Sequence, residues 1–215
     1  MCFSATASLI AGGALTAAGV ATIRKTETKA ELPFASIPLL FGIQQITEGV
    51  IWLSFGSPLL NIAMTYVYSM FSHVLWPIFV PIAILLLEKD LMRKKVLHVF
   101  SGIGLAVGIF LFYFILTDGV TSEITSNSIA YISPHLYLPL VMTLYVLATC
   151  GSWFVSSHKI INIFGVVFLT SFAVAAWFFS ETFISVWCFF AAVLSAIIYW
   201  YFRNNLITQK LAETV

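Results

Sequence analysis

The chain has 215 residues, of which 60% are hydrophobic and only 9% are charged, and its formal net charge is +1. Soluble globular domains contain roughly 25% charged residues, and a soluble chain of this length could not bury so much apolar surface. The composition therefore excludes a soluble protein. We expect the lipid bilayer to be the solvent, and we expect no nucleic-acid partner.

The apolar runs are long and do not alternate as the strands of a membrane barrel would, so they predict transmembrane helices. In chain order, the seven expected spans are Ala5–Ile23, Pro33–Phe55, Asn61–Leu87, Val96–Leu116, Tyr131–Phe154, Ile160–Phe179 and Phe183–Phe202. The connections are short, except for the polar stretch Thr117–Ala130. We therefore predict an all-α polytopic transmembrane bundle of seven helices, with residues 1–215 in one domain.

The basic residues predict the orientation of this bundle. All 10 Lys and Arg residues fall in connections on one side of the predicted membrane: Arg24, Lys25, Lys29, Lys89, Arg93, Lys94, Lys95, Lys159, Arg203 and Lys210. Because basic loops stay in the cytoplasm, we expect the N-terminus outside and the C-terminus cytoplasmic. The first span has no basic segment before it and is followed by basic residues, so we expect an uncleaved span rather than a signal peptide.

Glu48 is the one acidic residue well inside a predicted span. Gln44 and Trp52 share its helix face at four-residue spacing, and Gln45 lies three residues away. An acid at mid-membrane costs about 2.5–3.5 kcal/mol on insertion scales, so it faces the bundle interior and has a partner. This segment predicts a polar ligand pocket, and a purely structural buried acid is the alternative.

The third span carries the expected counterpart of this polar segment. One of its faces holds Tyr66, Ser69, His73 and Trp76. Folding the second and third spans about the tight connection at residues 56–58 sets Glu48 level with residues 66–69 and the glutamines level with residues 69–73. We therefore expect Ser69 and His73 to face the pocket, and a satisfied core histidine is the alternative for His73.

Two further polar residues fall in the outer half of the predicted membrane. His135 lies near the start of the fifth span and Glu181 lies just before the seventh, and each is a candidate for the pocket or an interfacial residue. His73 and His135 each lie four residues before a proline, Pro77 and Pro139. Because proline removes the hydrogen bond to the carbonyl four residues back, we expect free carbonyl groups and kinks at both histidines.

Cysteines and small residues give weaker signals. Cys2 is a candidate thiol at the outer mouth of the pocket, with apolar packing as its alternative, and no metal-binding cysteine spacing is present. Trp187 is expected at the membrane interface and Trp177 in the packed interior. The Gly- and Ala-rich first span predicts close helix packing, with a homodimer as the alternative.

Five stretches of the chain resemble one family. They are MCFSATAS at residues 1–8, ELPFA at 31–35, the segment 44–52, LWP at 75–77 and SVWCFFA at 185–191. Together they resemble an uncharacterised family of small prokaryotic membrane proteins that begin MCFSA, and the likeness covers nearly the whole chain. It implies a multi-pass protein of the inner (cytoplasmic) membrane, and it implies no ligand or catalytic residue.

The sequence leaves several functions open. The leading interpretation is an outward-facing intramembrane pocket that binds or translocates a small ligand or ion, formed by Gln44, Gln45, Glu48, Ser69, His73, His135 and Glu181. One alternative is an intramembrane hydrolase in which Glu48, His73 and His135 ligate a divalent metal and leave a position for water. Another is a structural or assembly subunit without chemistry. Retinal is excluded as a cofactor because no predicted span contains a lysine for its Schiff base.

Overall fold

The computed structural model describes residues 4–125 and 127–213, without the side chains of residues 134, 180, 193, 194, 196 and 204–213. Within this part of the chain, six helices are long and apolar enough to cross a membrane. They are α1 (Ala5–Ile23), α2 (Leu32–Ser54), the continuous helix Pro58–Leu87, α5 (Leu91–Thr117), α8 (Lys159–Phe178) and α9 (Phe183–Glu213). A seventh, shorter apolar helix covers Pro139–Val155. The chain is thus a helical bundle with the character of a multi-pass membrane protein.

Two of these helices contain wider turns. The helix Pro58–Leu87 consists of α3 (Pro58–Ser69), a π-helical stretch over Met70–Leu75 and α4 (Trp76–Leu87). The shorter helix consists of α6 (Pro139–Val146), a second π-helical stretch over Leu147–Gly151 and α7 (Ser152–Val155). The irregularity expected near His73 is therefore present as a π-helix that ends at Leu75, two residues before Pro77, and the Trp76 N–H reaches the Phe71 carbonyl.

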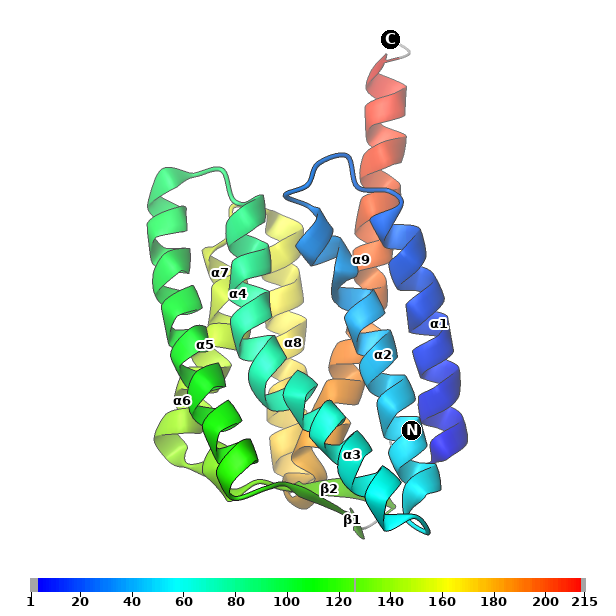
Figure 1. Ribbon diagram of the computed structural model, residues 1–215. Helices are drawn as coiled ribbons and strands as arrows, with labels where there is room; N and C mark the ends of the chain where they lie inside the picture. Colours follow the sequence, from blue (N-terminus) through cyan, green and yellow to red (C-terminus); the bar gives the residue numbers. More distant parts are fainter. Residues whose placement is uncertain (1–3, 126, 214–215) are drawn as a thin grey trace.

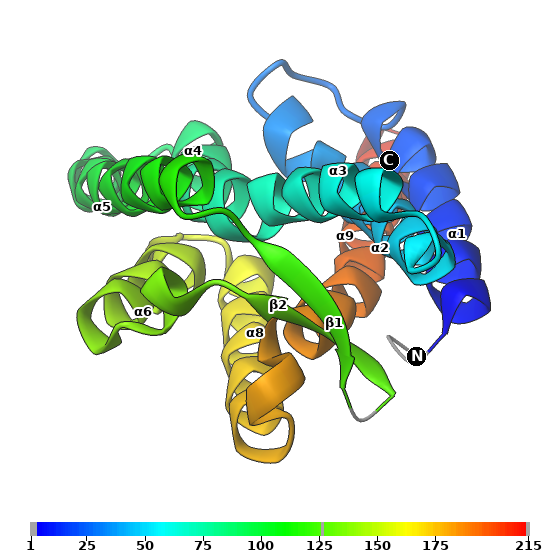
Figure 2. The same ribbon diagram turned by 60° about the horizontal axis from the view of Figure 1, so that its bottom comes forward.

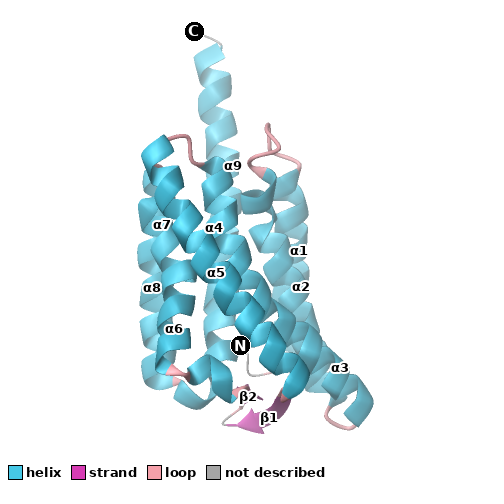
Figure 3. Cartoon of the chain, turned by 60° about the vertical axis from the view of Figure 1, so that its left-hand side comes forward, coloured by secondary structure: helices cyan, strands magenta, loops and turns pink. Residues whose placement is uncertain are grey.

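The helices run alongside one another, and the two ends of the bundle differ (Figures 1 and 3). One end holds the start of α1, the α2–α3 turn and a β-hairpin; we call it the hairpin end. The other end holds the connections at residues 24–31, 88–90 and 156–158, which carry or adjoin the basic residues; we call it the basic end. The gathering of these loops at one end agrees with the charge pattern, while the orientation in a membrane stays a prediction.

Helices α1 and α2 pack backbone against backbone. A Cβ atom added at Gly12 would lie 2.9 Å from the Gly42 carbonyl oxygen, and one added at Gly42 would lie 2.6 Å from the Thr16 nitrogen. Such distances leave no room for a side chain at either position, which is how small residues bring membrane helices together. The close helix packing predicted from the composition of the first span is confirmed.

The polar stretch before the fifth helix forms a hairpin instead of a loop (Figure 2). Strand β1 (Thr121–Thr125) pairs antiparallel with β2 (Ser128–Ile132), with Thr125 opposite Ser128. Asn127, in the two-residue connection, has a positive φ of 62°, which asparagine tolerates and tight hairpins require. The prediction of a helix from Tyr131 onward is therefore wrong, because these β-branched and aromatic residues pair as a strand.

The start of the shorter helix corrects a second expectation. A 3-10 turn over Pro134–Tyr137 follows the hairpin, and Pro139 is the first residue of α6. Proline suits that position because the first N–H of a helix has no intrahelical partner in any case. The interpretation of His135 as a helical residue with a carbonyl freed by Pro139 is therefore wrong.

The core is rich in aromatic side chains that lie between the helices. Trp153, Tyr68, Tyr145 and Phe34 are among its largest fully buried members. Trp187 is buried with them at 3% exposure, whereas Trp177 is 83% exposed. The expectations for both tryptophans are therefore wrong: Trp187 lies in the packed interior, and Trp177 lies on the surface of the bundle.

Candidate functional site

Glu48 lies on α2 with no part of it exposed. Its Oε1 atom accepts a hydrogen bond of 2.6 Å from the Ser185 hydroxyl of α9 and one of 3.4 Å from the Tyr131 hydroxyl of β2. The carboxyl group therefore ties together a helix near the start of the chain, the hairpin and the last helix. These three elements are distant in sequence and meet toward the hairpin end of the bundle (Figure 1).

The hairpin covers this carboxyl group through an aromatic stack. The ring of Tyr131 lies parallel to the ring of Tyr68 on α3, with centroids 4.2 Å apart and 4° between the planes. The side chains of Tyr68 and Gln45 face the same carboxyl group. The second oxygen, Oε2, has no hydrogen bond of normal geometry among the described residues.

The groups around Glu48 are neutral. Among the described residues, the one ion pair joins His135 to Asp118, so Glu48 has no basic partner there. Its surroundings are hydroxyl and amide groups from Ser185, Tyr131, Tyr68 and Gln45. A carboxylate removed from water without a compensating charge is costly, and this environment therefore favours a proton or a bound cation on Glu48.

Gln44 extends the polar cluster toward the middle of the bundle. Its Oε1 atom accepts a 2.7 Å hydrogen bond from the Trp76 indole N–H, and the Trp76 ring stacks on Phe41 at 3.9 Å. The Gln44 amide and the Tyr68 hydroxyl also face the Cys188 thiol on α9. Gln44, Gln45 and Glu48 are thus brought together at one face of α2, as the sequence predicted.

His73 and Ser69 are buried in the neighbouring helix but do not bond to Glu48. The His73 Nδ1 atom lies 2.7 Å from the Ser72 hydroxyl, while Nε2 has no partner among the described residues. The Ser69 hydroxyl is likewise buried without a partner there. The Tyr145 hydroxyl donates to the Ser72 carbonyl. Because π-helical turns occur frequently at functional sites, these unpaired polar atoms in and beside such a turn are noteworthy.

His135 and Glu181 lie elsewhere. The Nε2 atom of His135 is 2.7 Å from an Asp118 carboxylate oxygen, and the ring stacks on Phe114 at 3.7 Å. Hydrogen bonding to His135 lowers the pKa of Asp118 below its usual value. Glu181 is exposed in a 3-10 turn, Ser180–Thr182. Both residues therefore lie at the hairpin end and outside the buried cluster around Glu48.

The predicted metal ligands are not gathered. Within residues 4–125 and 127–213, no group of three or more His, Cys, Asp or Glu side chains could hold a metal ion. Glu48, His73 and His135 consequently do not form the three-ligand site that the hydrolase alternative requires. Cys2 lies outside the described residues, and Cys150 and Cys188 are buried free thiols.

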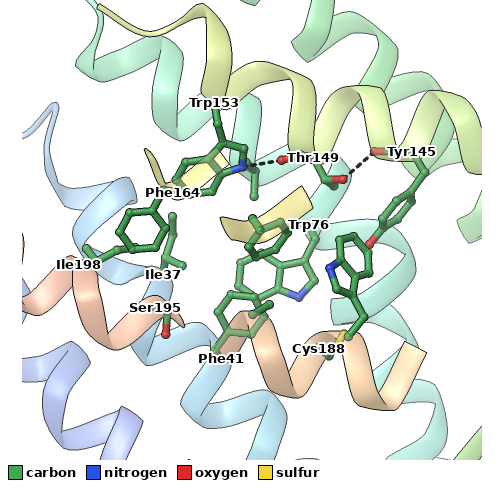
Figure 4. Close-up of a pocket in the computed structure, with 14 residues that line it drawn as sticks. Ile37, Phe41, Trp76, Tyr145, Thr149, Trp153, Phe164, Cys188, Ser195 and Ile198 are labelled. Atoms are coloured by element: carbon green, nitrogen blue, oxygen red, sulfur yellow. Dashed lines mark hydrogen bonds between the residues drawn. The ribbon is translucent and has the colours of Figure 1, made fainter. Parts of the chain in front are cut away.

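A narrow aromatic cavity (Figure 4) adjoins the polar cluster through Trp76, which lines the cavity and donates to Gln44. Trp76, Trp153, Phe41, Phe164 and Cys188 are among its lining residues. Its free volume is about 20 Å³, which is space for about one water molecule. Polar groups in its lining already bond to the protein: the Trp153 N–H donates to the Thr149 carbonyl at 2.5 Å and the Trp76 N–H donates to Gln44 at 2.7 Å. This region is therefore packed core rather than an open ligand pocket.

Three contributors to the cluster were missed or undervalued in the sequence. Tyr68, Tyr131 and Ser185 all reach Glu48, and none of the three is among the residues predicted for the pocket. A signal for Tyr68 was present: Asn61, Thr65, Tyr68 and Ser72 form a polar face of the third span at helical spacing. This face lies beside the predicted face that holds Ser69 and His73. It contacts the hairpin, because the Thr65 and Ser122 hydroxyls lie 2.8 Å apart.

Comparisons with known proteins place the chain in one family. A family model described as "Family of unknown function (DUF6629)" matches residues 1–213. No curated protein and no solved structure matches the chain. The family match covers nearly the whole chain and agrees with the resemblance carried by the N-terminal string and the SVWCFFA segment. The protein therefore belongs to the DUF6629 family of unknown function.

Proposed function

We propose that this protein is a multi-pass membrane protein that binds a proton or a small monovalent cation at Glu48 and exchanges it at the hairpin end. The observation that carries the proposal is the fully buried Glu48 carboxyl group, which is surrounded by neutral donors and lacks a basic partner among the described residues. Ionisable residues inside membrane bundles commonly mark ion pathways and proton relays.

The kind of ion follows from charge and donor chemistry. One carboxylate supplies a single negative charge, which one proton or one monovalent cation neutralises. Ser185, Tyr131 and Tyr68 place hydroxyl oxygens beside the carboxylate, and oxygen ligands suit hard cations. The same groups hydrogen-bond to a protonated carboxyl, so either ion fits the site.

The direction of exchange rests on the charge pattern. The connections at residues 24–31 and 88–90 and the basic start of α5 lie at the end of the bundle away from the hairpin. By the positive-inside rule, that end is cytoplasmic. The hairpin end then faces outward, and in a prokaryotic cell it faces away from the cytoplasm across the inner membrane.

Infrared difference spectroscopy tests the assignment of Glu48. Purified protein in detergent is taken through a series of pH values, and then through added Na⁺ or K⁺ at fixed pH. We expect a carboxyl band that changes with proton or cation concentration in the wild type and is absent in Glu48→Gln. Glu123→Gln, which changes an exposed acid on β1, is the matched control and should keep the band.

Thermal unfolding provides the second readout. Because glutamine needs no compensating charge, Glu48→Gln should fold with stability equal to or above that of the wild type, while losing any stabilisation by the cation. The proposal is contradicted if the wild type and Glu48→Gln show the same response to pH and cations, both in the infrared spectrum and in the unfolding temperature.

A further inference from the structure

A second site lies at the basic end, far from Glu48. A groove with a volume of about 360 Å³ lies between the α1–α2 connection, the end of α4, the start of α5 and the last helix. Its charged lining includes Lys25, Lys89 and Lys94 as well as Glu27, Glu31 and Glu88. Both signs of charge thus face one groove.

The carboxyl groups of this groove are partly engaged by the backbone. Glu88 is 1% exposed, and its two oxygens accept four hydrogen bonds from Lys89, Asp90 and Ser157. The Oε2 atom of Glu31 accepts the N–H groups of Glu27 and Thr28 at 2.8 and 3.2 Å. The other oxygen of Glu31, on a partly exposed side chain, is left to face a ligand.

In the part of the chain that the structure describes, the lysines of the groove form no ion pair with an acidic residue. Among the described residues, neither Lys89 nor Lys94 forms an ion pair, and the Lys25 ammonium group lies 5.9 Å from the Tyr199 ring centroid. Ammonium groups at such positions bind phosphate oxygens. The acidic residues in the same groove would repel a ligand that is only anionic, so the lining favours one that carries both charges.

The apolar part of the lining indicates what else the ligand contains. Leu86, Leu87 and Phe202 also line the groove, and α4 and α9 continue from there as apolar helices. A ligand with a charged head and an apolar body fits both parts, as do the phospholipids of the surrounding bilayer.

We propose that this groove binds the headgroup of a phospholipid that carries both a phosphate and a primary ammonium group, as phosphatidylethanolamine does. Lys89 and Lys94 bind the phosphate, and Glu31 binds the ammonium group. The site depends on the protein lying in a bilayer and is independent of any role of Glu48.

Native mass spectrometry tests the proposal. Protein in detergent is offered phosphatidylethanolamine, phosphatidylglycerol or phosphatidylcholine at equal concentration, and inorganic phosphate is added as a competitor. We expect phosphatidylethanolamine to be retained best, because phosphatidylglycerol lacks the ammonium group and the quaternary ammonium of phosphatidylcholine cannot donate to Glu31. Millimolar phosphate should not displace the bound lipid.

Neighbouring lysines on α5 supply a matched pair of variants. Lys94 lines the groove, while Lys95 is exposed and outside it. At about 1 kcal/mol per lysine near the headgroups, Lys94→Gln should weaken binding of phosphatidylethanolamine about five-fold. Lys95→Gln should leave it unchanged, Lys89→Gln should match Lys94→Gln, and Glu31→Gln should remove the preference over phosphatidylglycerol.

Several outcomes would overturn the inference. Equal weakening by Lys94→Gln and Lys95→Gln would show general attraction to a basic surface instead of a site. Tighter binding of phosphatidylglycerol, displacement by inorganic phosphate, or no retention of any lipid would each refute the assigned ligand. None of these outcomes bears on the infrared test of Glu48, so the two proposals fail separately.

Discussion

Replacing Glu88 by glutamine perturbs the junction that closes the basic end of the bundle. Glu88 follows α4, and its carboxylate joins the start of α5 to the loop before α8. Oε1 accepts the N–H groups of Lys89 and Asp90 and the Ser157 hydroxyl, at 2.9, 3.0 and 2.7 Å. Oε2 accepts the Ser157 N–H at 2.6 Å. Glutamine keeps one acceptor oxygen but places an NH₂ group against the Ser157 N–H.

The expected cost follows from the lost hydrogen bond. A hydrogen bond to a charged group contributes about 1.5–3 kcal/mol to stability, and glutamine removes one such bond and the charge from the other three. For a chain of this size, about 2 kcal/mol lowers the unfolding temperature by roughly 4–8 °C. The measurement is tryptophan fluorescence during heating in detergent at pH 7, with Glu123→Gln as the control for loss of an exposed acid.

The pH dependence gives this prediction a second, independent readout. Burial raises the pKa of Glu88, but hydrogen bonds from Asp90, Ser157 and Lys89 outweigh it and lower the pKa from 4.5 to about 2. Because the folded pKa is below the unfolded one, the stabilisation is complete above pH 4.5 and is lost as the pH falls toward 2. Solvent screening near the surface limits the loss to about 1–2 kcal/mol.

Glutamine does not titrate, so the difference between the wild type and Glu88→Gln should shrink across this range. A Glu88→Gln protein that unfolds within about 1 °C of Glu123→Gln at pH 7 would refute the reasoning. A gap between the wild type and Glu88→Gln that stays constant down to pH 3 would refute it equally.

Three further predictions concern other parts of the fold. Gly104→Ala should lower stability by at least about 1–3 kcal/mol, because the added Cβ atom would lie 1.8 Å from the Pro77 carbonyl oxygen. Gly102→Ala is the control in the same thermal assay and should not destabilise the protein, because the space around Gly102 is open. Ser185→Ala should cost about 1–3 kcal/mol, because it removes the 2.6 Å donor to the buried Glu48 carboxyl group. Ser195→Ala loses only a bond to the Ala192 carbonyl of its own helix and should cost less in the same unfolding measurement. The orientation can be tested with single cysteines placed at the exposed positions Ser57, Asn127 and Lys29 in a Cys2→Ser background. A membrane-impermeant thiol reagent added outside intact cells should label the cysteines at positions 57 and 127 but not the one at position 29. The reverse pattern would overturn the predicted orientation.

The sequence predicted the helical bundle and the centre of the candidate site. Hydropathy places helices reliably because a membrane-spanning segment satisfies its backbone internally, and the structure begins α1 and α9 at the predicted residues, Ala5 and Phe183. Glu48 was identifiable because a buried acid is costly wherever it lies in a membrane. Its neighbours Gln44 and Gln45 followed from helical spacing alone.

The partners of Glu48 could not be predicted in the same way. Ser185 lies 137 positions away and Tyr131 lies 83 positions away, and helical spacing says nothing about which helices meet. Tyr131 was also assigned to a helix, since its apolar surroundings fit a span as well as a strand. The sign against a helix was the high share of β-branched residues on both sides of Asn127, which indicates two strands joined by a turn.

The two ends of the bundle differ in how they would let an ion reach Glu48. From the basic end, the path crosses the aromatic core around Trp76 and Phe41, whose cavity has a free volume of about 20 Å³. From the hairpin end, the covering group is Tyr131, which is held by its stack on Tyr68 and its long hydrogen bond to Glu48. The hairpin is tied to α3 through the Ser122 hydroxyl, which lies 2.8 Å from Thr65 and donates to Asn61 at 3.2 Å. Displacing one ring and a few hydroxyl contacts disturbs less packing than opening an aromatic core, so exchange at Glu48 is expected through the hairpin end.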